Sequence, residues 1–169
     1  MGKLIGVMFV IAVCVSGTGY YNRVQCLSND GPQLAAHNYL VAVKEDRFED
    51  AYQYVTPNMT DGESVAEWAK LQRNLYQMLR ITIDKIDVRA GHRQLKNPFM
   101  CANISEVPNV LHASDVLNNQ GSSEFEVYTM VMDDGAWKID SQRTLYDETM
   151  IRQWFPEDEI PFFKDTLIK

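Results

Sequence analysis

Basic residues are scarce in this sequence. Sixteen Lys and Arg stand against twenty-three Asp and Glu, which gives a formal net charge of −7 at pH 7. Proteins that bind nucleic acid usually carry a basic face, so the charge balance argues against a nucleic-acid partner. Internal repeats and low-complexity tracts are also missing. What remains is a chain with 46% apolar residues, which is ordinary for one globular domain.

Cysteine and histidine are rare as well, with three of each. No Cys-x-x-Cys pair occurs, so the spacing typical of a zinc site is missing. The sequence also contains no nucleophile elbow, no glycine-rich phosphate loop and no paired-His motif. We therefore expect no catalytic constellation, no metal site and no cofactor, and the chain is predicted not to be an enzyme.

The N-terminal segment is a long stretch without charge. Residues 4–21 are eighteen uncharged residues that follow Lys3. About 20 helical residues span the ~30 Å hydrocarbon core of a bilayer, so this segment is near the lower limit for a single-pass anchor. An anchor would end in paired tyrosines at the far interface. Its characteristic side chains would be Leu4, Val7, Phe9, Ile11, Val15, Tyr20 and Tyr21.

Two alternatives remain open for the same segment. A cleaved signal peptide would use residues 4–15 as its apolar region, with Gly17 and Gly19 before the cleavage site. A lipoprotein would carry its lipid on Cys14, although Val13 stands where a small residue is usual. All three interpretations predict that most of the chain is exported across the membrane. The anchor reading places it on the periplasmic side of an inner membrane.

The two other cysteines, Cys26 and Cys101, lie in the exported part. In an oxidising compartment they could pair, and closing so long a loop would contribute on the order of 4 kcal/mol in the chain-entropy model. The alternative is two separate buried thiols.

Helical periodicity appears in the first half of the chain, after a polar linker at residues 22–31. Helices are expected at residues 32–45, 48–55 and 64–79. The third begins with Ser64 and Glu67, which have the spacing of a capping box.

The periodicity then changes to two, as in strands. Strands are expected at residues 79–90, with a bulge near the middle, and at 99–107, 124–132 and 136–140. Residues 91–98 are polar and basic and are predicted to form a loop, residues 110–119 stay ambiguous, and a helix is plausible at 147–154. Helices followed by antiparallel strands indicate an α+β fold, with two to three helices packed on one face of a curved antiparallel sheet.

This order resembles the nuclear transport factor 2-like superfamily, also described as cystatin-like or SnoaL-like. Residues 35–52 resemble its opening helix pair, and residues 134–139 resemble its terminal hairpin. The resemblance covers residues 32–142 and implies a cone-like domain, followed by a C-terminal extension at 143–169. The most similar type is the bacterial envelope protein that carries such a domain behind a lipoprotein signal or a membrane anchor.

Some members of this superfamily are isomerases and dehydratases, which place an acid or His base in a pocket between sheet and helices. The candidate bases here are His37, Asp84, Asp87, His92 and His112. Each has a simpler interpretation as a helix-flank, strand-surface or loop residue. The tyrosines more often belong to a core or rim than to a catalytic site, and they are Tyr39, Tyr52, Tyr54, Tyr76 and Tyr128.

The function expected from location is that of a non-catalytic accessory subunit, anchored in the membrane and docked on a larger membrane protein complex. An aromatic tail suits contact with a partner surface, although it could instead pack on its own domain. Its residues are Trp154, Phe155, Phe162 and Phe163. The alternative is a periplasmic small-molecule-binding protein, or an isomerase- or dehydratase-like enzyme that uses the cone pocket.

Overall fold

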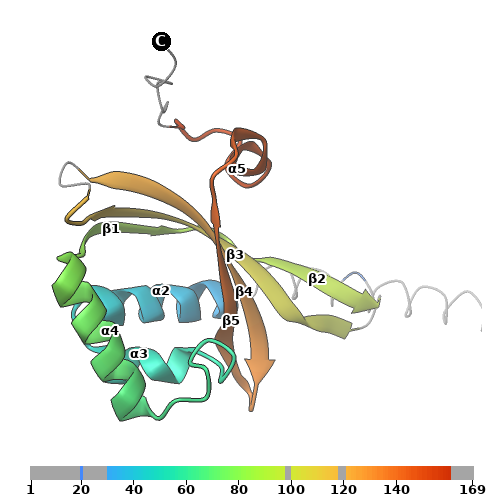
Figure 1. Cartoon of the computed structure of the whole chain (residues 1–169). Helices are drawn as coiled ribbons and strands as arrows, with labels where there is room; N and C mark the ends of the chain where they lie inside the picture. The colour runs from blue at the N-terminus through green and yellow to red at the C-terminus, as the bar shows by residue number, and fades with distance from the viewer. Residues whose placement is uncertain (1–19, 21–29, 98–99, 118–120, 161–169) are drawn as a thin grey trace, which may run out of the picture.

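The computed structural model describes residue 20 and residues 30–97, 100–117 and 121–160 (Figure 1). Within these ranges, no helix is long and apolar enough to cross a membrane. Most of the residues singled out at the two ends of the chain lie outside the described residues. They are Leu4, Val7, Phe9, Ile11, Cys14, Val15, Tyr21, Cys26, Phe162 and Phe163.

The predicted helices are present, and their ends differ from the expectation by a residue or two. They are α2 (Gly31–Lys44), α3 (Phe48–Ala51) with the 3-10 turn η1 (Tyr52–Tyr54), α4 (Val65–Leu79) and α5 (Glu148–Trp154). The capping box at the start of α4 is formed: the Ser64 side chain accepts from the Glu67 backbone N–H, and the Glu67 carboxylate accepts from the Ser64 backbone N–H.

The strands form one antiparallel sheet in the order β1-β3-β4-β5, with β2 paired to β3. They are β1 (Thr82–Val88), β2 (His92–Asn97), β3 (Met100–Ser114), β4 (Ser122–Asp133) and β5 (Ala136–Leu145). The register of β1 against β3 shifts between Ile83 and Lys85, which confirms the predicted bulge.

One sequence prediction about strands is wrong, and the structure assigns part of one segment that was left ambiguous. Residues 91–98 were expected as a loop, but residues 92–97 form β2; residues 110–114, left ambiguous, complete the long strand β3. Strand β2 was missed in the sequence because its residues are mostly polar. This strand extends beyond the core, so it needs no apolar face, and it pairs with β3 through backbone hydrogen bonds.

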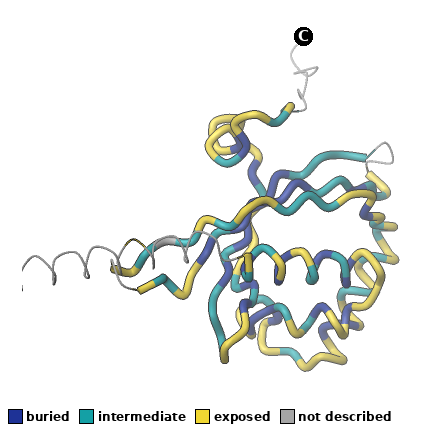
Figure 2. Tube along the Cα trace, turned by 180° about the vertical axis from the view of Figure 1, so that it is seen from behind, coloured by how far each residue is buried: buried dark blue, intermediate teal, exposed yellow. Residues whose placement is uncertain are grey.

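Helices cover both faces of the sheet, as Figure 1 shows. On β4, Tyr128 and Met130 pack in the cluster beneath α2, whereas Phe125 and Val127 alternate with them and pack beneath α5. Figure 2 shows the buried residues concentrated along the centre of the sheet and the facing sides of the helices. The fold is therefore α+β as predicted, with an additional helix on the second face.

Replacing Ser64 with alanine should lower the free energy of unfolding by about 1 kcal/mol, because the start of α4 loses its side-chain acceptor. Urea denaturation of the variant measures this. Ala66→Ser, on the exposed surface of the same helical turn, is the matched control and should change stability by less than about 0.5 kcal/mol. Equal stability of the Ser64→Ala variant and the parent would contradict a contribution from the cap.

Candidate functional site

A buried carboxyl group lies between the sheet and helix α2. Glu126 is on β4, two residues before Tyr128, and strand alternation turns both side chains toward the helices. Only 1% of Glu126 is exposed. Burying a carboxyl group is costly unless hydrogen bonds compensate, so its partners determine what this position does.

Three side chains from three strands donate hydrogen bonds to Glu126. The Asn109 amide on β3 and the Tyr128 hydroxyl both donate to Oε2, at 2.9 and 2.7 Å. The Gln142 amide on β5 donates to Oε1 at 2.6 Å. Both carboxyl oxygens are therefore engaged by the chain itself. Gln142 is the exposed member of this group and connects it to the surface.

Burial dominates the electrostatics of this cluster. It raises the pKa of Glu126 above its usual range, and the hydrogen bonds from Tyr128 and Asn109 offset only part of this shift. Burial, together with the charge of Glu126, also raises the pKa of Tyr76 to about 12 and raises the pKa of Tyr39 and Tyr128. Burial thus makes the ionised forms of this carboxyl group and of these phenols more costly than they are in water.

Two buried polar atoms near this cluster have no hydrogen-bond partner among the described residues. They are the Asn109 Oδ1 and the Ser105 Oγ, both on the face of β3 that the helices cover. The Tyr39 ring meets the Tyr128 ring edge to face at 6.5 Å between centroids. The cluster therefore combines a buried, hydrogen-bonded carboxyl group with one acceptor, the Asn109 Oδ1, that no donor among the described residues reaches.

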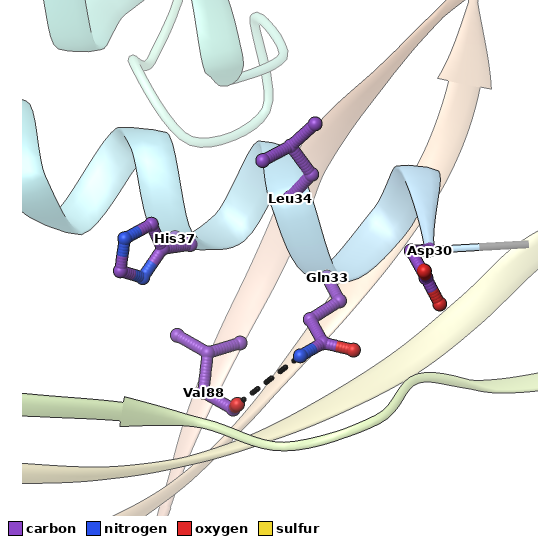
Figure 3. Close-up of a pocket in the computed structure, with 5 residues that line it drawn as sticks. All are labelled: Asp30, Gln33, Leu34, His37 and Val88. Atoms are coloured by element: carbon purple, nitrogen blue, oxygen red, sulfur yellow. Dashed lines mark hydrogen bonds between the residues drawn. The ribbon is translucent and has the colours of Figure 1, made fainter.

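His37 does not join this cluster. It is exposed on α2 and lines an open groove of about 480 Å³ between α2 and the end of β1, together with Asp30, Gln33, Leu34 and Val88. Figure 3 shows these side chains, with the Gln33 amide donating to the Val88 carbonyl oxygen at 3.4 Å. The two titratable side chains among its lining residues, Asp30 and His37, are both exposed.

The other candidate bases are also separate from Glu126. Asp84 is exposed on β1, and Asp87 forms an ion pair with Arg89 at 3.0 Å. His92 and His112 were expected in loops, and this was wrong because both are in strands. The His92 ring meets the Trp154 ring edge to face, with 5.3 Å between ring centroids. The His112 Nδ1 lies 2.9 Å from the Ser123 Oγ across the β3–β4 pair.

Glu126 and Asn109 were missed in the sequence. The alternation in residues 124–132 places Glu124, Glu126 and Tyr128 on one face of a strand. The opposite face carries Phe125 and Val127, which are more apolar. Strand alternation alone would have turned this second face toward the main core. Only the presence of α5 on that side shows why both faces are buried.

Two of the four residues of the predicted aromatic tail, Trp154 and Phe155, are among the described residues. Phe155 is 3% exposed and packs on Phe125 at 5.0 Å between ring centroids. Trp154 is half-buried against His92. These two rings pack on their own domain, so contact of the tail with a partner would depend on Phe162 and Phe163, outside the described residues.

Cys101, one member of the predicted disulfide, is half-buried on β3 and takes part in a disulfide. Cys26 lies outside the described residues, so its pairing with Cys101 stays a prediction. No group of three or more His, Cys, Asp or Glu side chains suited to a metal ion occurs among the described residues.

No family model and no curated protein matches this chain. Solved structures similar to it include three bacterial proteins. A ketosteroid isomerase-like protein from Erwinia carotovora atroseptica has 11% identity and a TM-score of 0.49, over 71% of this chain and 99% of that one. A cystatin-like domain of unknown function from Nostoc punctiforme has 13% identity and a TM-score of 0.48, over 73% and 80%. Bdellovibrio bacteriovorus Bd1075 has 9% identity and a TM-score of 0.46, over 67% of this chain.

The chain spans 38% of the length of the Bdellovibrio protein. All three structures have identities to this chain below 25% and TM-scores below 0.5. At this level of similarity they leave both the family and the function of this chain to be argued from its own residues.

Proposed function

We propose that this chain is a non-catalytic accessory subunit of the bacterial envelope. Residues 4–21 anchor it in the inner membrane, and its periplasmic domain docks on a larger membrane protein complex. The observation that carries the proposal is an apolar face on α4 that the domain itself leaves uncovered. Leu71, Leu75 and Met78 on this helix are 53%, 38% and 69% exposed.

These three side chains recur at a spacing of four and three residues, so they lie along one side of the helix. The neighbouring side of α4 packs on the core through Trp68 and Ala69. The apolar surface of α4 is therefore wider than the part that the fold covers, whereas a surface helix usually turns polar residues to solvent.

A second segment extends this surface at the end of α4. The Val116 backbone N–H donates to the Leu79 carbonyl oxygen at 2.9 Å, which fixes residues 116–117 beside the helix. Val116 is 48% exposed and Leu117 is 91% exposed. We call the set Leu71, Leu75, Met78, Val116 and Leu117 the α4 apolar face. Apolar side chains gathered on the exposed side of one helix and beside its end are typical of a contact site for a protein, and the partner should present an uncharged apolar surface.

The interior supports a binding role over a catalytic one. Glu126 is the buried acid between sheet and helices, and its two oxygens already accept hydrogen bonds from Asn109, Tyr128 and Gln142. A general base must instead reach the proton of a substrate directly or through one water. The hydrogen bonds within the chain occupy the oxygens of Glu126 that would have to do this.

Leu75→Arg should release the subunit from its complex, because a charge on the α4 apolar face would be buried unpaired in the interface. The measurement is native electrophoresis of membranes solubilised in mild detergent. We expect the unaltered chain in a species much larger than its own 19.4 kDa and the variant outside that species. Gln77→Arg, on the polar side of α4, is the control and should stay in the complex. Migration of the unaltered chain as a lone subunit would contradict the proposal.

A second function has a specific observation in its favour. The Asn109 Oδ1, which has no donor among the described residues and lies beside the buried Glu126, could hold a small polar ligand, as a periplasmic binding protein or an isomerase- or dehydratase-like enzyme would need. A bound small molecule detected by native mass spectrometry of the purified chain, and lost in Asn109→Leu, would favour this second function over docking.

A further inference from the structure

The β2–β3 hairpin projects from the domain beside the start of α2. Figures 1 and 2 show it extending past the sheet at the end where α2 begins. Gly91, just before β2, lies so close to α2 that a Cβ there would be 3.7 Å from the Pro32 Cβ. The Gln33 amide also donates to the Val88 carbonyl oxygen. The chain that precedes residue 30 therefore joins the domain next to this hairpin.

A covalent bond reinforces this neighbourhood. Cys101, near the tip of the hairpin, takes part in a disulfide, and the other two cysteines of the chain are Cys14 and Cys26. The predicted pairing of Cys101 with Cys26 would connect the hairpin to the N-terminal segment. If the partner is Cys26, as predicted, only five residue steps separate it from Tyr21, which span at most about 18 Å.

The hairpin differs in charge from the rest of the chain. Between Asp87 and Glu106 the sequence contains Arg89, Arg93 and Lys96 and no Asp or Glu, in a chain whose net charge is −7. Arg89 and Arg93 are engaged within the domain, by an ion pair and by stacking over an aromatic ring. Lys96 is exposed.

Apolar side chains accompany this charge on the surface of the hairpin. Met100 and Ile104 on β3 are 53% and 55% exposed. Exposed apolar residues beside a cation are typical of elements that lie at a membrane interface, where apolar atoms enter the headgroup region and cations attract anionic lipid.

We propose that the β2–β3 hairpin rests on the surface of the bilayer, with Met100 and Ile104 in the headgroup region and Lys96 near anionic lipid phosphates. The inference rests on the proposed anchoring of residues 4–21. It adds an orientation: the start of α2 and the hairpin face the membrane, while the α4 apolar face, near the other end of α2, remains available to the partner complex (Figure 1).

The test uses the full chain reconstituted in vesicles of phosphatidylcholine and phosphatidylglycerol that contain brominated lipid, which quenches tryptophan fluorescence at short range. In Met100→Trp the added emission should be quenched. In the matched control Met78→Trp, on the α4 apolar face, it should not be. Met100 and Cys101 are consecutive on β3 and point to opposite faces of the strand, so the substitution preserves the disulfide.

The charge contribution is tested by adding Lys96→Gln to Met100→Trp. Loss of one cation near an anionic surface should weaken the contact roughly fivefold, and vesicles of phosphatidylcholine alone should remove this difference. Quenching of the residue-100 tryptophan no stronger than that of the residue-78 tryptophan would overturn the inference. The same result is expected if the hairpin contacts another protein and not lipid, and it would overturn the inference in that case too.

Extraction with alkaline carbonate separates the two proposals. If the chain stays in the vesicles but the residue-100 tryptophan is not quenched, the anchor stands and the hairpin inference falls. If the chain is released, both are overturned.

Discussion

Replacing Glu126 with alanine should lower the free energy of unfolding by about 2–6 kcal/mol, because each of two buried donors left without its acceptor costs about 1–3 kcal/mol. The Asn109 amide, the Tyr128 hydroxyl and the Gln142 amide would all lose their acceptor. Asn109 is fully buried and Tyr128 is 1% exposed, so water cannot replace the lost oxygen without opening the core. Urea denaturation of the variant and the parent measures the difference.

Glu126→Gln is the matched control. Its amide oxygen can accept from Asn109 and Tyr128, while its amide nitrogen can donate to Gln142 once that exposed side chain turns its own oxygen inward. The expected cost is therefore below about 1.5 kcal/mol. If the alanine variant were as stable as the glutamine variant, the three hydrogen bonds would contribute nothing measurable.

The free energy of unfolding should also depend on pH differently in the parent and in Glu126→Gln. Burial raises the pKa of Glu126 above its ordinary 4.5. As pH rises above 4.5, the unfolded chain releases this proton while the folded domain keeps it, so the folded state binds more protons and this group lowers stability. The loss levels off above the folded-state pKa. Glu126→Gln cannot titrate, so its stability relative to the parent should improve as pH rises through this window, as urea midpoints at a series of pH values would show.

Replacing Phe155 with alanine is the second change with a large expected effect, about 3–5 kcal/mol of lost stability. The ring is 3% exposed and packs with Phe125, Leu145 and Ile151 between α5 and the sheet. Truncation leaves a cavity that the rigid sheet cannot close. Thermal or urea unfolding of the purified chain measures the loss.

Met150→Ala, on the exposed side of α5, is the control and should change stability by less than about 0.5 kcal/mol. A similarly small change for Phe155→Ala would mean that α5 is not integral to the domain. The expected result would instead make residues 143–155 part of the cooperative unit, and the C-terminal extension would begin later than the sequence suggested.

Local chemistry explains why the helices could be predicted. Ser64 and Glu67 satisfy each other's backbone donors within one turn, so the start of α4 is encoded by residues three apart. The β4–β5 hairpin is likewise encoded by its Asp-Gly turn, where Asp134 and Gly135 both have positive φ. The strand β2 lacks such a local signal, since only the neighbouring strand β3 gives its polar residues a pairing partner.

The sequence by itself determined the order of helices and strands, the capped start of α4, the closing hairpin and the acidic charge, because each depends on residues close together in the chain. Only the tertiary structure decided that Glu126 is buried, that α5 covers the second face of the sheet and that the β2–β3 hairpin stands beside the start of α2. Each of these depends on contacts between residues far apart in sequence, such as Asn109 with Glu126 or Phe125 with Phe155. Alternation along a strand shows which side chains share a face, but only packing shows what covers it.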